Sequence, residues 1–191
     1  MRDNPEAERA GAADFNELVA RYEKPIFNVI YRILGDYDEA ADVTQETFIS
    51  AYRGFSRFRG DASVYTWLYQ IAVNHSRNRL RRRKRPDIAG VESLDAPRSA
   101  EGEEVGPREI PDSSSAPHVA LEQKEMREKI AAAIEALPPE YREVVVLREM
   151  HGMSYAEIVS VTGLSMDNVK TRLSRARAML RRRLEHYYSP E

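Results

Sequence analysis

The sequence predicts an all-α protein in which two small helical domains are joined by an irregular linker. Apolar residues recur at helical spacing in residues 14–72 and again in residues 119–180, a period typical of amphipathic helices. The residues between them are rich in Pro, Ser, Gly and acids and lack any period, as linkers do. We therefore expect a flexible N-terminal lead over 1–12, a first domain over 13–85, an acidic linker over 86–118 and a second domain over 119–187.

The first domain is predicted to begin with two helices. Asp14 is a suitable N-cap for the first, whose apolar face continues to Gly35. Acids in residues 36–39 suit the first turn of a second helix that runs to Phe55. A calcium loop is the other interpretation of Asp36, Asp38 and Asp42, but the glycine and distal glutamate of an EF-hand are missing.

A third helix is predicted after the loop at residues 56–63, and it ends in a run of cations up to Arg85. Tyr65, Trp67 and Tyr69 precede these cations, and aromatic rings beside arginines are typical of proteins that bind single-stranded nucleic acid. Trp67 itself is better explained as a core residue. Asn74 lies one turn beyond the packing positions, where its amide could contact a base edge.

The second domain contains the spacing of a helix-turn-helix. Val159, Gly163 and Val169 supply a packing residue, a permissive turn residue and an apolar anchor, and Ser165 can cap the second helix. A plain helical hairpin would share this pattern. An unbroken run of cations without acids favours phosphate binding instead. These cations are Lys170, Arg172, Arg175, Arg177, Arg181, Arg182 and Arg183.

Composition excludes several classes of function. The 191 residues include no cysteine and only four scattered histidines, so disulfides, thiolate metal sites and cysteine nucleophiles are excluded, and we expect no metal, no cofactor and no catalytic residue. No segment has the length and apolarity of a membrane span, and the N-terminus does not resemble a signal peptide, so we expect a cytoplasmic protein without membrane insertion. The net charge of −2 hides two basic runs on either side of the acidic linker.

One polar face of the second predicted helix has two interpretations from the residues alone. Asp42, Gln45, Glu46 and Ile49 recur every three to four residues away from the apolar stripe. This pattern fits either a solvated face or a docking face for a partner.

Four segments, in chain order, resemble the conserved regions of the extracytoplasmic-function sigma factors of bacterial RNA polymerase, nearest the envelope-stress sigma-E type. They are RYEKPIFNVIYRILGD, DEAADVTQETFISAYRGFSRFRGDASVYTWLYQIAVNHSRN, LPPEYREVVVLREMHGMSYAEIVSVTGLS and VKTRLSRARAMLRRRL. The resemblance covers both domains and implies an alternative sigma factor, which recognises the minus-35 and minus-10 promoter elements and helps to melt DNA. It implies no enzyme activity in the chain.

The resemblance also assigns roles to residues. The candidates for docking on the β′ clamp helices of the polymerase are Asp42, Gln45, Glu46, Phe48, Ile49 and Tyr52. The candidates for capturing a flipped base of the minus-10 strand are Phe58, Arg59, Gly60, Asp61, Ala62, Asn74, Arg77 and Arg79. The candidates for reading the minus-35 element in the major groove are Ser165, Asp167, Asn168, Lys170, Thr171, Arg172, Ser174, Arg175 and Arg177.

The partners implied are core RNA polymerase, through its β′ clamp helices and β flap, promoter DNA, and an anti-sigma factor that can be membrane-bound.

The extended linker would reach about 110 Å, which exceeds the roughly 60 Å of a 17-base-pair promoter spacer. Val159 and the SMDNV start of the recognition helix depart from the family pattern, so the minus-35 sequence cannot be transferred from a relative. The competing hypothesis is a stand-alone helix-turn-helix regulator, which would need a dimer interface.

Overall fold

The computed structural model describes residues 5–55, 58, 63–84 and 117–188, and all regular structure within them is helical. The predicted all-α class is therefore confirmed for this part of the chain. The elements are α1 (Pro5–Leu34), α2 (Tyr37–Phe55), α3 (Val64–Arg83), α4 (Pro117–Glu135), α5 (Pro139–Val145), the π-helical turn η2 (Val146–Met150), α6 (Tyr155–Thr162) and α7 (Met166–Tyr188). None of the described helices is both long and apolar enough to cross a membrane.

Helix α1 begins earlier than its apolar pattern predicts. It starts at Pro5, so Asp14 is an interior position and the prediction of an N-cap there was wrong. The segment PEAERAGAA opens with a proline, which suits a first helical position, and is rich in Ala, Glu and Arg, which are strong helix formers. The helix propensity of these residues therefore extends α1 toward the N-terminus, past the first residue of its apolar face.

Helices α1, α2 and α3 pack together as the N-terminal half. The Asp36 carboxylate accepts the Glu39 N–H at 2.9 Å at the start of α2, and the Ser63 hydroxyl accepts the Thr66 N–H at 3.1 Å at the start of α3. Fully buried side chains of α1 and α3, such as Ile30 and Leu68, lie in its core. These contacts fix the faces that α2 and α3 present outward.

The C-terminal half contains the predicted helix-turn-helix. Ser154 and Glu157 form a capping box at the start of α6, and Gly163 ends that helix in the left-handed region at φ +69°. The Asn168 N–H donates to the Ser165 hydroxyl at 3.2 Å, which confirms the predicted cap of α7. Val169 is fully buried, as an apolar anchor should be.

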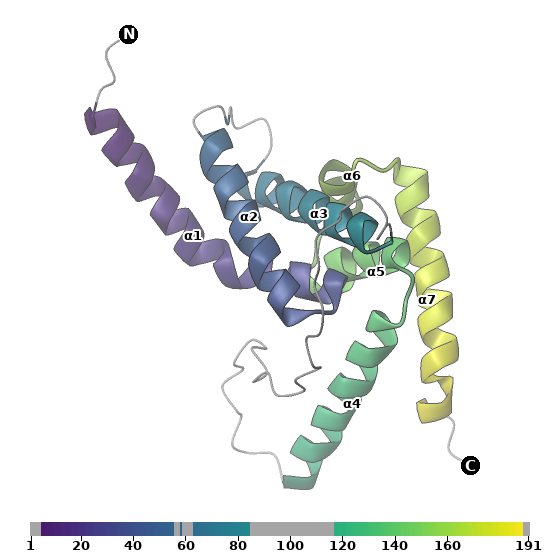
Figure 1. Cartoon of the computed structure of the whole chain (residues 1–191). Coiled ribbons are helices and arrows are strands. Elements are labelled where there is room, and N and C mark those ends of the chain that lie inside the picture. Colours follow the sequence, from purple (N-terminus) through teal and green to yellow (C-terminus); the bar gives the residue numbers. More distant parts are fainter. Residues whose placement is uncertain (1–4, 56–57, 59–62, 85–116, 189–191) are drawn as a thin grey trace.

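The two halves pack directly against each other, although the sequence suggested that a long linker could separate them. Figure 1 shows α3 between α2 and the pair α5 and α6, and α3 contacts both α2 and α6. One continuous buried cluster includes Leu68 and Ala72 of α3 together with Ile158 and Val161 of α6. The predicted linker lies almost entirely outside the described residues.

Candidate polymerase and nucleic-acid interfaces

The outward face of α2 carries the predicted polymerase-docking set. Asp42, Gln45 and Glu46 are exposed, and Phe48 is half-buried. Ile49 is 51% exposed and Tyr52 is 60% exposed, which is high for side chains of this size. Large apolar side chains left in water next to a polar rim are typical of a protein-binding surface. An open hollow beside them is lined by Phe15, Phe48, Ile49, Tyr52 and Arg53.

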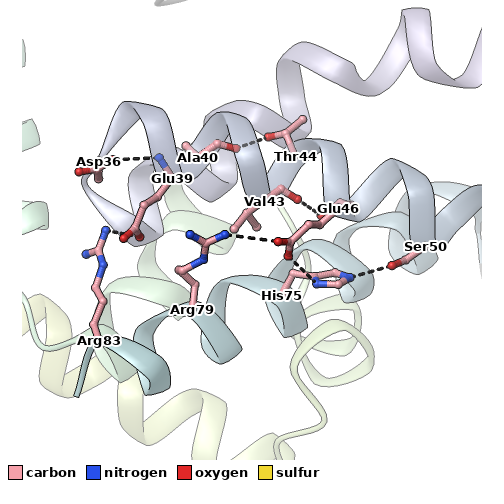
Figure 2. Close-up of polar contacts among 11 residues, drawn as sticks. Asp36, Glu39, Ala40, Val43, Thr44, Glu46, Ser50, His75, Arg79 and Arg83 are labelled. Atoms are coloured by element: carbon pink, nitrogen blue, oxygen red, sulfur yellow. Dashed lines mark hydrogen bonds and ion pairs between the residues drawn. The ribbon is translucent and has the colours of Figure 1, made fainter. Parts of the chain in front are cut away.

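Glu46 connects this face to α3, as Figure 2 shows. Its carboxylate lies 3.3 Å from the Arg79 guanidinium and 3.4 Å from Nδ1 of His75. The other ring nitrogen of His75 lies 2.9 Å from the Ser50 hydroxyl. A residue predicted to bind polymerase is thus paired with Arg79, which was predicted to bind minus-10 DNA.

The predicted minus-10 site is only partly within the described residues. Arg59, Gly60, Asp61 and Ala62 lie outside them. The ring of Phe58 is 4.9 Å from that of Trp67, which is half-buried as part of the packing. Asn74 is exposed on α3, so its amide is accessible to a ligand.

Tyr69, in contrast, is not accessible to stack on a base. It is only 1% exposed, and its hydroxyl lies 2.9 Å from Nδ1 of His151, in the other half of the chain. Tyr65 is half-buried and donates to the His151 carbonyl at 3.3 Å. Burial lowers the pKa of His151 to about 4 and raises the pKa of Tyr69. No sequence motif marked His151, because its role depends on a contact with Tyr69, which is 82 positions earlier in the sequence.

Arg77 was predicted to contact minus-10 DNA, but in this structure it binds protein. Its Nε and Nη2 donate to the two oxygens of Glu143 at 2.8 and 2.6 Å, and its Nη1 donates to the Thr162 carbonyl at 2.8 Å. The basic run gave no indication that Arg77 differs from its neighbours. Glu143 did carry a signal, because it lies four residues before the buried Leu147, where helical spacing places an inward position.

The predicted minus-35 residues lie in the turn before α7 and in the first half of α7, which also carries the anchors Val169 and Leu173. All of them are exposed except Arg172, which is half-buried. The start of α7 therefore offers side chains of the length and polarity that can enter a major groove. The full set is Ser165, Asp167, Asn168, Lys170, Thr171, Arg172, Ser174, Arg175 and Arg177.

Arg177 differs from Arg175 on the same helix because it has an acidic partner. Its Nη2 lies 2.6 Å from the Glu149 carboxylate, which belongs to the π-helical turn. The hydrogen bonds from Arg177 to Glu149 raise the pKa of Arg177. The local sequence shows no acid within this basic run, so the pair was not predicted.

Two protein-family models match this chain, one in each half. Residues 18–86 match the model described as Sigma-70 region 2, and residues 127–180 match the model described as Sigma-70, region 4. The chain is 36% identical over 179 residues to the RNA polymerase sigma-H factor of Pseudomonas aeruginosa, a match that covers 93% of this chain and 90% of that protein. It is 37% identical to the ECF RNA polymerase sigma-E factor of Escherichia coli K12, over 85% of this chain and 82% of that protein. The chain belongs to the extracytoplasmic-function family of RNA polymerase sigma factors.

Solved structures agree with this sigma-factor fold. CnrH, in complex with the cytosolic domain of CnrY, is 25% identical with a TM-score of 0.61, over 94% of this chain and 95% of that one. The sigma factor RpoE of Bartonella quintana, in complex with the anti-sigma factor NepR, is 22% identical with a TM-score of 0.63, over 90% of this chain and 97% of that one. In this sigma factor, region 2 contains α2 and α3, and region 4 contains α6 and the start of α7.

Proposed function

We propose that this sigma factor binds core RNA polymerase through the outward face of α2. The observation that carries the proposal is the exposure of Ile49 and Tyr52 beside the polar side chains of Asp42 and Gln45. Burying two such side chains against the clamp helices would supply several kcal/mol, at about 1.5 to 3 kcal/mol for each large apolar group. The polar rim would fix the register of docking.

The same chain then contacts promoter DNA in two places. Asn74 and residues 58–62 receive a base flipped from the minus-10 strand, and cations of α3 bind its phosphates. The first turns of α7 enter the major groove of the minus-35 element, where Lys170 and Arg175 are exposed. Two contacts on one chain select promoters that have both elements at the correct spacing.

In this scheme the polymerase catalyses RNA synthesis, and this chain recognises the promoter and helps to melt it. An anti-sigma factor that covers the α2 face or α7 would keep the protein inactive. Because the polymerase and the promoter are in the cytoplasm, we place this sigma factor there.

The test is transcription in vitro with purified core polymerase and a library of genomic fragments. We expect promoter-specific initiation that requires both the polymerase and this chain. A lack of specific initiation at every fragment, with a chain that still binds defined DNA sites by itself, would contradict the proposal and favour a stand-alone regulator.

A further inference from the structure

The Glu46 carboxylate, on the proposed polymerase-docking face of α2, is held on both oxygens by side chains of α3. Its Oε1 lies 3.3 Å from Nη2 of Arg79, and its Oε2 lies 3.4 Å from Nδ1 of His75. The Glu46 side chain nevertheless remains 46% exposed. A carboxylate can accept about four hydrogen bonds. Glu46 therefore has acceptor capacity left for a partner that approaches from outside.

The His75 ring is fixed from two directions, as Figure 2 shows. Its Nε2 lies 2.9 Å from the Ser50 hydroxyl, and its Nδ1 faces Glu46. Glu46 and Ser50 are four residues apart on α2, so they are neighbours on one side of that helix. A neutral ring with its proton on Nδ1 satisfies both contacts, because the Ser50 hydroxyl then donates to Nε2. The two contacts give the ring an orientation in which it supports Glu46.

His75 itself is poorly placed to contact DNA or polymerase. Its side chain is 27% exposed, and both ring nitrogens are directed at α2. The preceding residue, Asn74, is exposed on α3 instead. His75 is therefore able to influence binding mainly through the side chain of Glu46.

An ordered carboxylate suits the docking of a cation. Binding orders a mobile glutamate side chain at a cost in conformational entropy, and contacts that order it beforehand remove part of that cost. Glu46 lies one turn from Asp42 and one turn from Ile49, and both of these side chains are exposed. The two acids make this face complementary to a positively charged partner. A lysine or arginine side chain beside an apolar contact is the partner that fits.

We propose that His75 is a positioning residue for polymerase docking, which holds the Glu46 carboxylate in place for a lysine or arginine side chain of the polymerase. This inference rests on the proposed function. It gives a role to a residue of the predicted DNA-binding helix whose contacts are with the docking helix. Ser50 supports the ring on its other nitrogen and is one step further from the partner.

A double-mutant cycle on the whole chain tests whether His75 acts through Glu46. The variants are His75→Ala, Glu46→Ala and the two combined, and the readout is the affinity for purified core polymerase. We expect His75→Ala to weaken binding about three- to tenfold, and Glu46→Ala to weaken it at least as much. Adding His75→Ala to Glu46→Ala should cause no further loss, because the carboxylate that His75 positions is then absent. Equal losses from His75→Ala in the two backgrounds would overturn the proposal, and so would no loss from either single variant.

His75→Asn separates positioning from simple packing of the ring. An asparagine amide can occupy the place of Nδ1 and donate to Glu46, so this variant should recover most of the affinity lost in His75→Ala. A loss in His75→Asn as large as that in His75→Ala would contradict the positioning role. Gln70→Ala is the matched control, since Gln70 is exposed on the same helix, and it should bind polymerase as the wild type does. An equal loss in Gln70→Ala would show that any change on α3 disturbs docking, and it would overturn the assignment to His75.

The outcomes also separate this inference from the proposed function. None of the three substituted side chains is fully buried, so each variant should stay folded, which circular dichroism checks. If the wild-type chain binds core polymerase but the cycle shows no coupling, the positioning role alone fails. If the wild-type chain does not bind core polymerase, the proposed function fails and this inference fails with it.

Discussion

Arg177 of the recognition helix and Glu149 of the π-helical turn form an ion pair, with Nη2 and Oε1 2.6 Å apart. Both side chains are about half exposed, so the pair contributes little to stability. Its effect is on DNA binding, because a guanidinium that is already paired gains less from a phosphate. In the described part of the chain, Arg175 has no such acidic partner.

Arg175 and Arg177 are therefore predicted to contribute unequally to DNA binding. Arg175→Ala should weaken binding to a minus-35 duplex by about 1 to 3 kcal/mol and should lower the salt dependence by about one phosphate contact. Arg177→Ala should cost less, because a guanidinium that is already paired with Glu149 gains less from a phosphate. Fluorescence anisotropy over a series of salt concentrations measures both. Equal losses for the two variants would contradict the assignment.

A charge introduced on the outward face of α2 is predicted to weaken binding to core polymerase. Ile49→Glu should weaken binding to core polymerase by at least about tenfold, since it puts a carboxylate into an apolar contact. The melting temperature should change little, because Ile49 is 51% exposed in the free protein. Leu121→Glu on α4 is the matched control, since Leu121 is a 58% exposed apolar residue outside this face. A similar loss of affinity for both variants would argue for nonspecific repulsion.

Asn74 is predicted to act in base recognition and not in packing. Asn74→Ala should weaken discrimination between minus-10 sequences by about 1 to 3 kcal/mol, because it removes an amide that can read a base edge. Core polymerase affinity should stay unchanged. Gln70→Ala is the matched control, since Gln70 is an exposed amide one turn earlier on α3. If Asn74→Ala lowers polymerase affinity as much as it lowers discrimination, the residue has a structural role.

His151 is predicted to make the contact between the two halves sensitive to pH. Burial lowers its pKa to about 4 when the halves are packed together, and 6.5 is the ordinary value of an exposed histidine. The packed arrangement therefore binds fewer protons than one in which His151 is exposed, so its stability is complete above pH 6.5 and falls as the pH drops toward 4, by about 3 kcal/mol at most. The groups that face the residue from α3 are Tyr65 and Tyr69.

Proton NMR of the histidine rings measures this pKa, and a His151→Gln spectrum assigns the signal. The His151 signal should titrate near pH 4 in the wild-type protein and closer to the ordinary value of about 6.5 in Arg77→Glu. A wild-type pKa near the ordinary value would show that His151 is solvated and that the two halves do not pack against each other.

Local spacing was enough to predict the features of the helix-turn-helix. The left-handed Gly163, the Ser165 cap and the buried Val169 follow from short-range rules of helix packing and capping, and each is present. The exposure of Ile49 and Asn74 follows from the same helical period. Each of these features involves only one or two helical turns, so residues that are close together in the sequence determine it.

Contacts between distant residues were not predictable in this way. Nothing in the basic run distinguishes Arg77, whose partner Glu143 is 66 residues away, from Arg79, whose partner is on the adjacent helix. The π-helical turn, which carries Glu149 and precedes His151, also has no signature in the apolar pattern. Both depend on how the two halves pack, and that packing is decided by the whole core.

Together with core polymerase, this chain is expected to recognise and open a promoter. The most direct measurement is permanganate reactivity of thymines around the minus-10 element of a promoter selected by transcription. We predict reactive, unpaired thymines only when core polymerase, the sigma factor and the promoter are all present, and a loss of this reactivity in Asn74→Ala. A duplex that stays closed with polymerase, while the chain alone protects its site, would contradict the account.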